Sequence, residues 1–137
     1  MAHVFVFLTT GFEEIEALAT VDVLRRAQLD VQTVSLTGER QVTGGHQVTV
    51  QADVLFEMAD FSAAQMLVVP GGTVKYAEHD GLKQRLLAFA QQGGKGAAIC
   101  ASPALLGGIG LLQGYLKRGV AFAHGGGVFV FAPDNFH

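Results

Sequence analysis

The only cysteine of the chain, Cys100, lies in a stretch typical of a reactive thiol. The small apolar run from Ala97 to Ile99 predicts a buried strand, and Pro103 suits the first turn of a following helix. Cys100 would then lie at a strand-to-helix corner, where free N–H groups and the helix dipole stabilise a thiolate. The stretch is equally compatible with a buried, inert cysteine at a strand end, since free cysteines are among the most buried residues.

Three glutamates open the first expected helix, which spans residues 12–28: Glu13, Glu14 and Glu16. Carboxylates near a helix N-terminus oppose its positive dipole end, and this ordinary role accounts for all three. Glu16 differs because, at helical spacing, it shares an uncharged face with Thr20, Val23 and Ala27. That face allows a Glu16 side chain that points inward, although a surface carboxylate is the more common case for a helix of this kind.

A glycine pair, Gly71 and Gly72, follows the apolar run of residues 66–69. Glycines at the carboxyl end of a parallel strand expose backbone N–H groups to the crevice where open α/β sheets bind ligands. A tight turn that needs glycine is the alternative explanation. Neither GxxxxGK[ST] nor GxGxxG occurs in the sequence, so we expect no nucleotide cofactor.

The order of the expected elements indicates an α/β fold, namely a doubly wound, mostly parallel sheet. The expected strands cover residues 3–8, 31–36, a hairpin over 42–50, 54–58, 66–69 and 97–99, and the helical segments cover 12–28, 61–64 and 78–92. The loop before Glu16, the glycine pair and Cys100 each follow a buried strand, so they converge on one sheet edge. A thiol, a carboxyl group and an amide pair can act there as nucleophile, acid and oxyanion hole.

Composition narrows the class of protein. The 137 residues are 50% hydrophobic and 15% charged, which predicts one globular domain over 1–137. A net charge of −3 does not indicate a basic surface that binds nucleic acid. A single cysteine excludes an intrachain disulfide and suits a reducing compartment.

The run Val4 to Leu8 is too short to span a membrane and lacks a preceding basic region, so we expect a cytoplasmic protein. The five histidines show no metal-ligand spacing, so no metal site is expected.

Four motifs in order resemble those of the ThiJ/PfpI superfamily, in the branch of the Parkinsonism-associated protein and its bacterial relatives. They are GFEEIE at 11–16, VDVLRRA at 21–27, VPGG at 69–72 and AAICASP at 97–103. The resemblance runs nearly continuously from residue 3 to about residue 115. It implies a flavodoxin-like fold, with helices on both faces of the sheet, and a homodimer.

The resemblance also implies roles for individual residues. Cys100 would be the reactive nucleophile, and Glu16 the protonated carboxyl partner that hydrogen-bonds to the thiolate. The amides of Gly71, Gly72 and Ala101 would form the oxyanion-type site.

The activities that the resemblance implies are diverse, and fold kinship does not choose among them. We expect an enzyme of glyoxalase or deglycase type, acting on small aldehydes or glycated groups without a cofactor. A non-catalytic sensor or chaperone that uses oxidation of Cys100 is the first alternative. A cysteine peptidase or amidase is the second, although it needs a base that the chain does not clearly offer.

The segment 116–137 departs from the family pattern. His124 is the candidate for the family's histidine near the thiol, but its surroundings in the sequence do not match. A truncation, a frameshift and a genuine divergence are all compatible with this departure. We therefore expect the fold to be incomplete at the C-terminus if the closing helix is missing.

Overall fold

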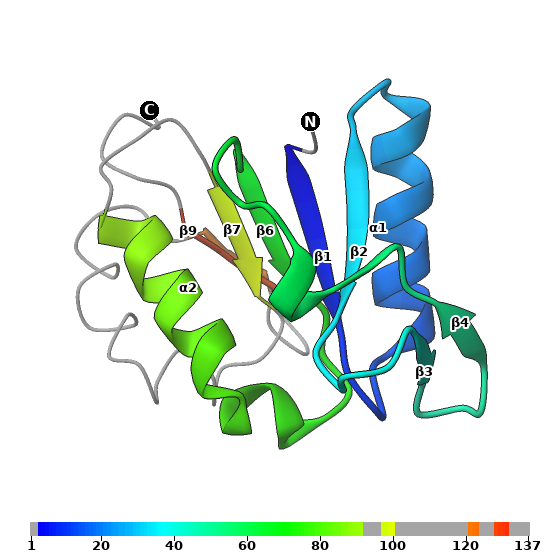
Figure 1. Cartoon of the computed structure of the whole chain (residues 1–137). Coiled ribbons are helices and arrows are strands. Elements are labelled where there is room, and N and C mark those ends of the chain that lie inside the picture. Colours follow the sequence, from blue (N-terminus) through cyan, green and yellow to red (C-terminus); the bar gives the residue numbers. More distant parts are fainter. Residues whose placement is uncertain (1–2, 92–96, 101–120, 124–127, 132–137) are drawn as a thin grey trace.

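Strand β1 (Val4–Leu8) lies inside the sheet, between β2 and β6, and all five of its residues are buried, as its continuous apolar run predicts. The computed structural model describes residues 3–91, 97–100, 121–123 and 128–131 (Figure 1). Within these residues, seven strands form one sheet in the order β5-β2-β1-β6-β7-β9-β8.

The elements have the following bounds. The strands are β2 (Val31–Ser35), β3 (Gln41–Thr43), β4 (Thr49–Gln51), β5 (Val54–Leu55), β6 (Met66–Val69), β7 (Ala97–Cys100), β8 (Ala121–Ala123) and β9 (Val128–Phe131). The α-helices are α1 (Glu14–Arg26) and α2 (Asp80–Gln91), and two 3-10 helices cover Phe56–Met58 and Val74–Glu78.

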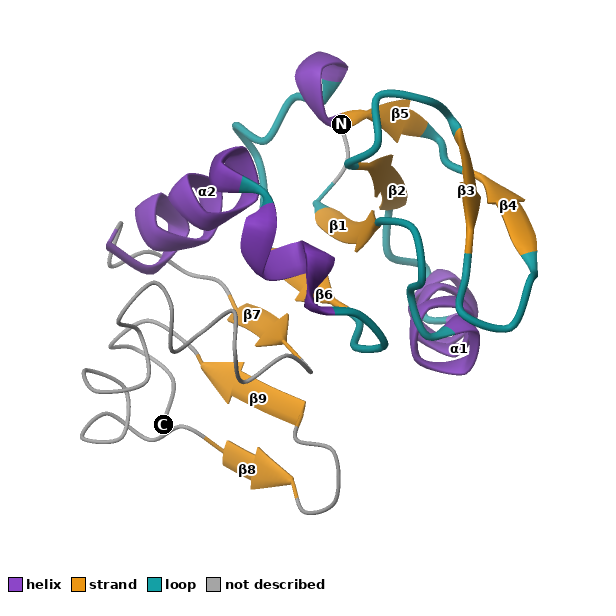
Figure 2. Ribbon diagram, turned by 90° about the horizontal axis from the view of Figure 1, so that it is seen from below, coloured by secondary structure: helices purple, strands orange, loops and turns teal. Residues whose placement is uncertain are grey.

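The predicted doubly wound, mostly parallel sheet is confirmed. Strands β5, β2, β1, β6 and β7 pair in parallel, while β9 and β8 add an antiparallel edge. The chain moves from β1 to β2 on one side through α1, and from β6 to β7 on the other side through α2. Because such crossovers are right-handed, opposite directions place the two helices on opposite faces of the sheet, as Figure 2 shows.

The inward face of α1 differs from the predicted one. Its buried residues are Glu14, Ala17 and Val21, whereas Glu16 is exposed and Val23 is 61% exposed. The inward orientation of Glu16, which the family resemblance favours over the surface one, is therefore wrong. The sheet is contacted by the small Ala17 and the branched Val21, one turn apart on the same side of the helix.

Other local predictions agree with the structure at the level of elements. Strands β3 and β4 form the predicted hairpin outside the main sheet, and Asp60 caps the turn before Ala64 by accepting from the Ser62 amide. The expected extended run 54–58 is a strand for two residues only, after which it turns into a 3-10 helix. The expected helix 78–92 is interrupted at His79, close to the predicted break.

None of the helices in the described part of the chain is long and apolar enough to cross a membrane. The helix expected after Cys100, together with Ala101 and His124, lies outside the described residues.

Candidate functional site

The predicted site residues follow strands that end at one edge of the sheet. Strands β1 and β6 are neighbours, and the chain leaves them toward opposite sides of the sheet. Such a switch point opens a crevice outside the carboxyl ends of the strands. In the next strand Cys100 pairs with Val69, so its backbone lies one residue before the level of the Pro70–Gly72 turn. The fold thus gathers the backbone of Cys100 and the glycine pair at the predicted edge.

The loop that joins β1 to α1 packs tightly against the glycine pair. The Glu13 amide donates a hydrogen bond to the Gly71 carbonyl at 2.9 Å. Gly72 has a φ of +105°, and a Cβ atom there would lie 2.5 Å from the Glu13 nitrogen. Glycine is therefore required at this position by both the backbone conformation and the close approach of the loop.

The Glu16 carboxylate reaches across this contact. The Gly71 amide donates to Glu16 Oε2 at 3.3 Å, so the structure brings these two predicted site residues together. The Gly71 N–H group is thereby directed at the Glu16 carboxyl group. The Glu16 amide, in turn, donates to Glu13 Oε2 at 2.8 Å, which caps α1.

Tyr76 anchors the segment that follows the glycine pair, and sequence reasoning did not single it out. Its side chain is fully buried, and its hydroxyl donates to the Phe7 carbonyl of β1 at 2.8 Å. The contact ties the 3-10 helix Val74–Glu78 to strand β1. A buried tyrosine hydroxyl usually finds such a partner, but the sequence does not tell which one.

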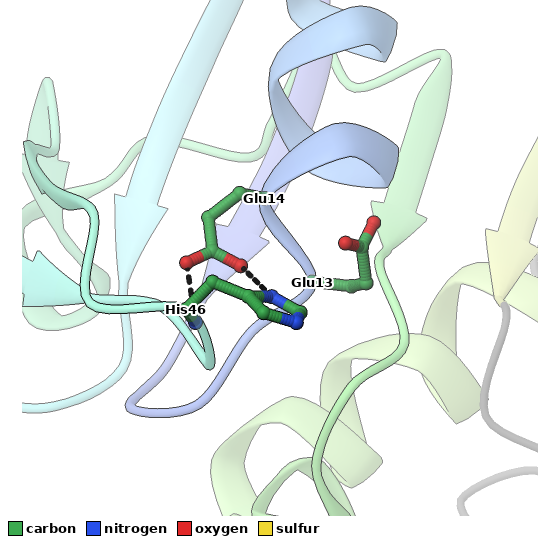
Figure 3. Close-up of side chains that lie close together, drawn as sticks. All are labelled: Glu13, Glu14 and His46. Atoms are coloured by element: carbon green, nitrogen blue, oxygen red, sulfur yellow. Dashed lines mark hydrogen bonds and ion pairs between the residues drawn. The ribbon is translucent and has the colours of Figure 1, made fainter.

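A second carboxylate of the same helical turn, Glu14, is buried against the β3–β4 hairpin (Figure 3). Its Oε2 accepts from the His46 amide at 2.6 Å and from the Val48 amide at 3.4 Å. Its Oε1 lies 3.0 Å from His46 Nδ1. The sequence analysis treated Glu14 as an ordinary helix-start charge, so this cluster was missed.

Charge and hydrogen bonding stabilise this pair. Burial by itself would raise the pKa of Glu14, but hydrogen bonds from the His46 side chain and from backbone amides outweigh it and lower the pKa from 4.5 to about 2. The pKa of His46 is raised above its ordinary 6.5, because its ring donates to the Glu14 carboxylate and lies in its negative field. At neutral pH Glu14 is therefore ionised.

The hairpin turn is shaped to receive the carboxylate. A Cβ atom on Gly44 would lie 2.6 Å from the Glu14 Cδ atom, so a side chain there would displace the carboxylate. The Gly44-Gly45-His46 sequence was the one local signal of such an approach.

Glu13, Glu14 and His46 place one possible ligand atom each within 4.8 Å of one another, an arrangement that could hold a metal ion. Spacing along the chain did not indicate it, because Glu14 and His46 are 32 residues apart. The Glu14 oxygens and one Glu13 oxygen already accept hydrogen bonds from the protein. Hydrogen bonding therefore accounts for the cluster without an ion.

Comparison with known proteins identifies relatives over most of the chain. The model of the DJ-1/PfpI family matches residues 2–118. The Arabidopsis thaliana protein DJ-1 homolog B is 36% identical over 88% of this chain, and the Danio rerio Parkinson disease protein 7 homolog is 34% identical over 80% of it. An archaeal protein named deglycase, from Thermococcus kodakarensis, is 28% identical over 81% of this chain and 68% of its own length.

Solved structures give the same result. Toxoplasma gondii DJ-1 in an oxidised form superimposes with a TM-score of 0.74 at 35% identity, covering 83% of this chain and 64% of that one. Drosophila melanogaster DJ-1beta has a TM-score of 0.72 at 30% identity, covering 81% and 62% of the two chains. The chain spans 28% of the length of the Arabidopsis relative and 60% of that of the Danio relative.

Proposed function

The chain belongs to the DJ-1/PfpI family, and we propose that it acts on small reactive aldehydes or glycated groups through the thiolate of Cys100. The observation that carries the proposal is the convergence of the Cys100 backbone, Gly71 and Glu16 at one sheet edge. The archaeal relative named deglycase supports the substrate class.

In the proposed first step, the Cys100 sulfur adds to the carbonyl carbon of the aldehyde. A carbon–sulfur bond forms while the π pair of the carbonyl moves to its oxygen, and a neutral Glu16 carboxyl group gives that oxygen its proton. The product is a hemithioacetal, and Glu16 is left as a carboxylate. This is nucleophilic catalysis assisted by a positioned general acid.

Backbone amides are the proposed partners of the developing oxyanion. We assign this role to Gly71, Gly72 and Ala101, with His124 as a further polar group near the thiol. Because the Gly71 amide donates to Glu16 in this structure, it becomes available to the substrate oxygen only when the carboxyl group turns away.

The test compares the wild-type protein with Cys100→Ser for consumption of methylglyoxal. We expect the variant to lose the protein-dependent rate, because a serine hydroxyl is a far weaker nucleophile at neutral pH. Equal rates for the two proteins would end the proposal. Circular dichroism of both proteins controls for misfolding.

A non-catalytic sensor is the second candidate, and the oxidised state of the Toxoplasma relative favours considering it. In this case peroxide would oxidise the Cys100 thiolate to the sulfenic and then the sulfinic acid, and Glu16 would hydrogen-bond to the product. A mass gain of two oxygens at Cys100 under mild peroxide, without turnover of any aldehyde, would select this function. The peptidase alternative would require cleavage of a peptide substrate that depends on Cys100.

A homodimer is also part of the proposal. The outward side of α1 exposes large apolar side chains, including Ile15 at 75% and Val23 at 61%, and an apolar helix surface of this kind suits a second copy of the chain. Sedimentation at micromolar concentration should give the mass of two chains, and Val23→Glu should shift it toward one. The proposed location is the cytoplasm, where a single cysteine remains reduced.

A further inference from the structure

The loop that carries the start of α1 is held from two sides. On the hairpin side, the Gly11 amide donates to the Thr43 carbonyl at 2.9 Å, and the Gly45 amide donates to the Phe12 carbonyl at 2.8 Å. On the β6 side, the Glu13 amide donates to the Gly71 carbonyl at 2.9 Å. Residues 11–13 therefore form a bridge between the hairpin and the glycine pair.

The Glu14 side chain reinforces the hairpin side of this bridge. Its carboxylate accepts from two hairpin amides and lies against the His46 ring, while its own backbone begins α1. Only 7% of the residue is exposed. A buried, ionised acceptor with these partners fixes both its own turn of helix and the hairpin turn.

We propose that Glu14, held by His46, is a positioning residue for the site: it fixes the loop 11–13 and so sets where Glu16 lies relative to Gly71. The chemical consequence rests on the proposed function, because it assumes that Glu16 serves Cys100. The claim that Glu14 holds the loop 11–13 in place does not rest on the proposed function. The hydrogen bonds of Glu14 in the described part of the chain go to the hairpin, whereas the Gly71 amide bonds to Glu16.

Two features favour positioning over simple stabilisation of the hairpin. The hairpin is joined to the loop by backbone hydrogen bonds on both flanks of Phe12, so movement of the turn displaces the loop directly. The Gly71–Glu16 bond is long, at 3.3 Å, so it is sensitive to a small displacement of the helix start. Glu13 is the other charged group near His46, and its carboxylate is engaged in capping α1.

The experiment measures amide hydrogen exchange in the full chain for Glu14→Ala, with two comparison variants. Glu14→Gln is the conservative variant, because a side-chain amide can still accept from the hairpin N–H groups and donate to an imidazole nitrogen. Asp53→Ala is the matched control, since Asp53 also accepts three hydrogen bonds, from the Thr33 amide, the Thr33 hydroxyl and Arg25. None of these partners belongs to the loop 11–13.

In Glu14→Ala we expect the Glu13 and Gly71 amides to exchange about tenfold faster or more, the effect of losing a charged hydrogen-bond acceptor. Glu14→Gln should restore most of the protection, and Asp53→Ala should leave these two amides unchanged relative to the amides of β1. Faster exchange confined to His46 and Val48, or spread equally over the β1 amides, would overturn the proposal. If Glu14→Ala does not fold, His46→Ala takes its place with the same criteria.

A second measurement separates this proposal from the proposed function. The pH midpoint of Cys100 alkylation should shift upward in Glu14→Ala, as in Glu16→Gln, but not in Asp53→Ala. If Glu16→Gln leaves the midpoint unchanged, the proposed role of Glu16 fails, and the exchange at Glu13 and Gly71 still decides whether Glu14 positions the loop. If Glu16→Gln shifts the midpoint and Glu14→Ala does not, the positioning role is contradicted.

Discussion

Two glutamates in the same turn of α1 have opposite surroundings. Glu14 is buried, pairs with His46 and accepts two backbone hydrogen bonds, so both of its carboxylate oxygens are engaged within the protein. Glu16 is exposed at the edge of the sheet, and within the described residues its carboxyl group accepts one long hydrogen bond, from the Gly71 amide. In the proposed mechanism the well-engaged Glu14 carboxylate holds the loop in place, and the loosely engaged Glu16 carboxyl group moves the proton.

The largest expected effect is that of Glu16→Gln on aldehyde consumption. Loss of a positioned general acid should lower the rate about 100-fold or more. Stability should change by no more than about 0.5 kcal/mol, since the side chain is exposed. The initial rate with methylglyoxal measures the first effect, and urea unfolding the second.

Glu14→Gln is the matched variant for this comparison. Its amide retains most of the geometry, so it should keep most of the activity at neutral pH. Equal losses in Glu14→Gln and Glu16→Gln would remove the distinction between the two glutamates.

The next effect concerns the contact between the loop and the glycine pair. Gly72→Ala should destabilise the protein by about 1–3 kcal/mol from its backbone conformation alone. The close approach to the Glu13 nitrogen adds to this cost. Urea unfolding measures the loss.

Gly38→Ala is the control, because Gly38 also has a positive φ, of +86°, but would meet nothing within 4 Å. Gly72→Ala should therefore be the more destabilising of the two. A Gly72→Ala protein as stable as Gly38→Ala would mean that the loop does not press on the glycine pair.

Acid should destabilise the folded protein by protonating Glu14. Its folded-state pKa of about 2 lies below the ordinary 4.5, so its contribution to stability is complete above pH 4.5 and is lost as the pH falls toward 2. The Tm difference between the wild type and Glu14→Gln should therefore shrink across this range. A difference that stays constant would contradict the ion pair.

The smallest expected effect is a loss of thermal stability at higher pH, and it comes from His46. Because its pKa is raised, the stability that its charge contributes is complete below pH 6.5 and is lost as the pH rises through the raised value. His46→Gln, compared with the wild type by thermal unfolding from pH 5.5 to 9, should show a Tm difference that narrows with rising pH. A widening difference would mean that the neutral ring, and not the cation, stabilises the hairpin.

Local sequence patterns predicted the order of strands and helices, but not which face of α1 is buried. Strand β6 lies where its apolar run placed it, because four apolar residues in a row, three of them buried, suit a central parallel strand. Helical spacing identified faces of α1, yet it did not tell which face the sheet covers, and the family resemblance favoured the wrong one for Glu16. The convergence of Glu16 and Gly71 at one edge was expected, because both follow strands that end there, but the hydrogen bond between them was not predicted.

The Glu14–His46 pair could not be predicted from the sequence for a different reason. It joins segments 32 residues apart and depends on how the β3–β4 hairpin folds over the helix start. No short-range periodicity carries that information. The glycines of the turn were the sole hint, because they leave room for a close approach without saying what approaches.

The central claim is that the edge formed by Glu16, the glycine pair and Cys100 is an assembled thiolate site. The most direct test is the pH dependence of Cys100 alkylation by iodoacetamide in the wild type and in Glu16→Gln. We expect the wild type to be alkylated with a pH midpoint well below about 8.5, the pKa of an unperturbed thiol, and Glu16→Gln to have a higher pH midpoint. A wild-type midpoint at or above about 8.5 that Glu16→Gln does not move would contradict it.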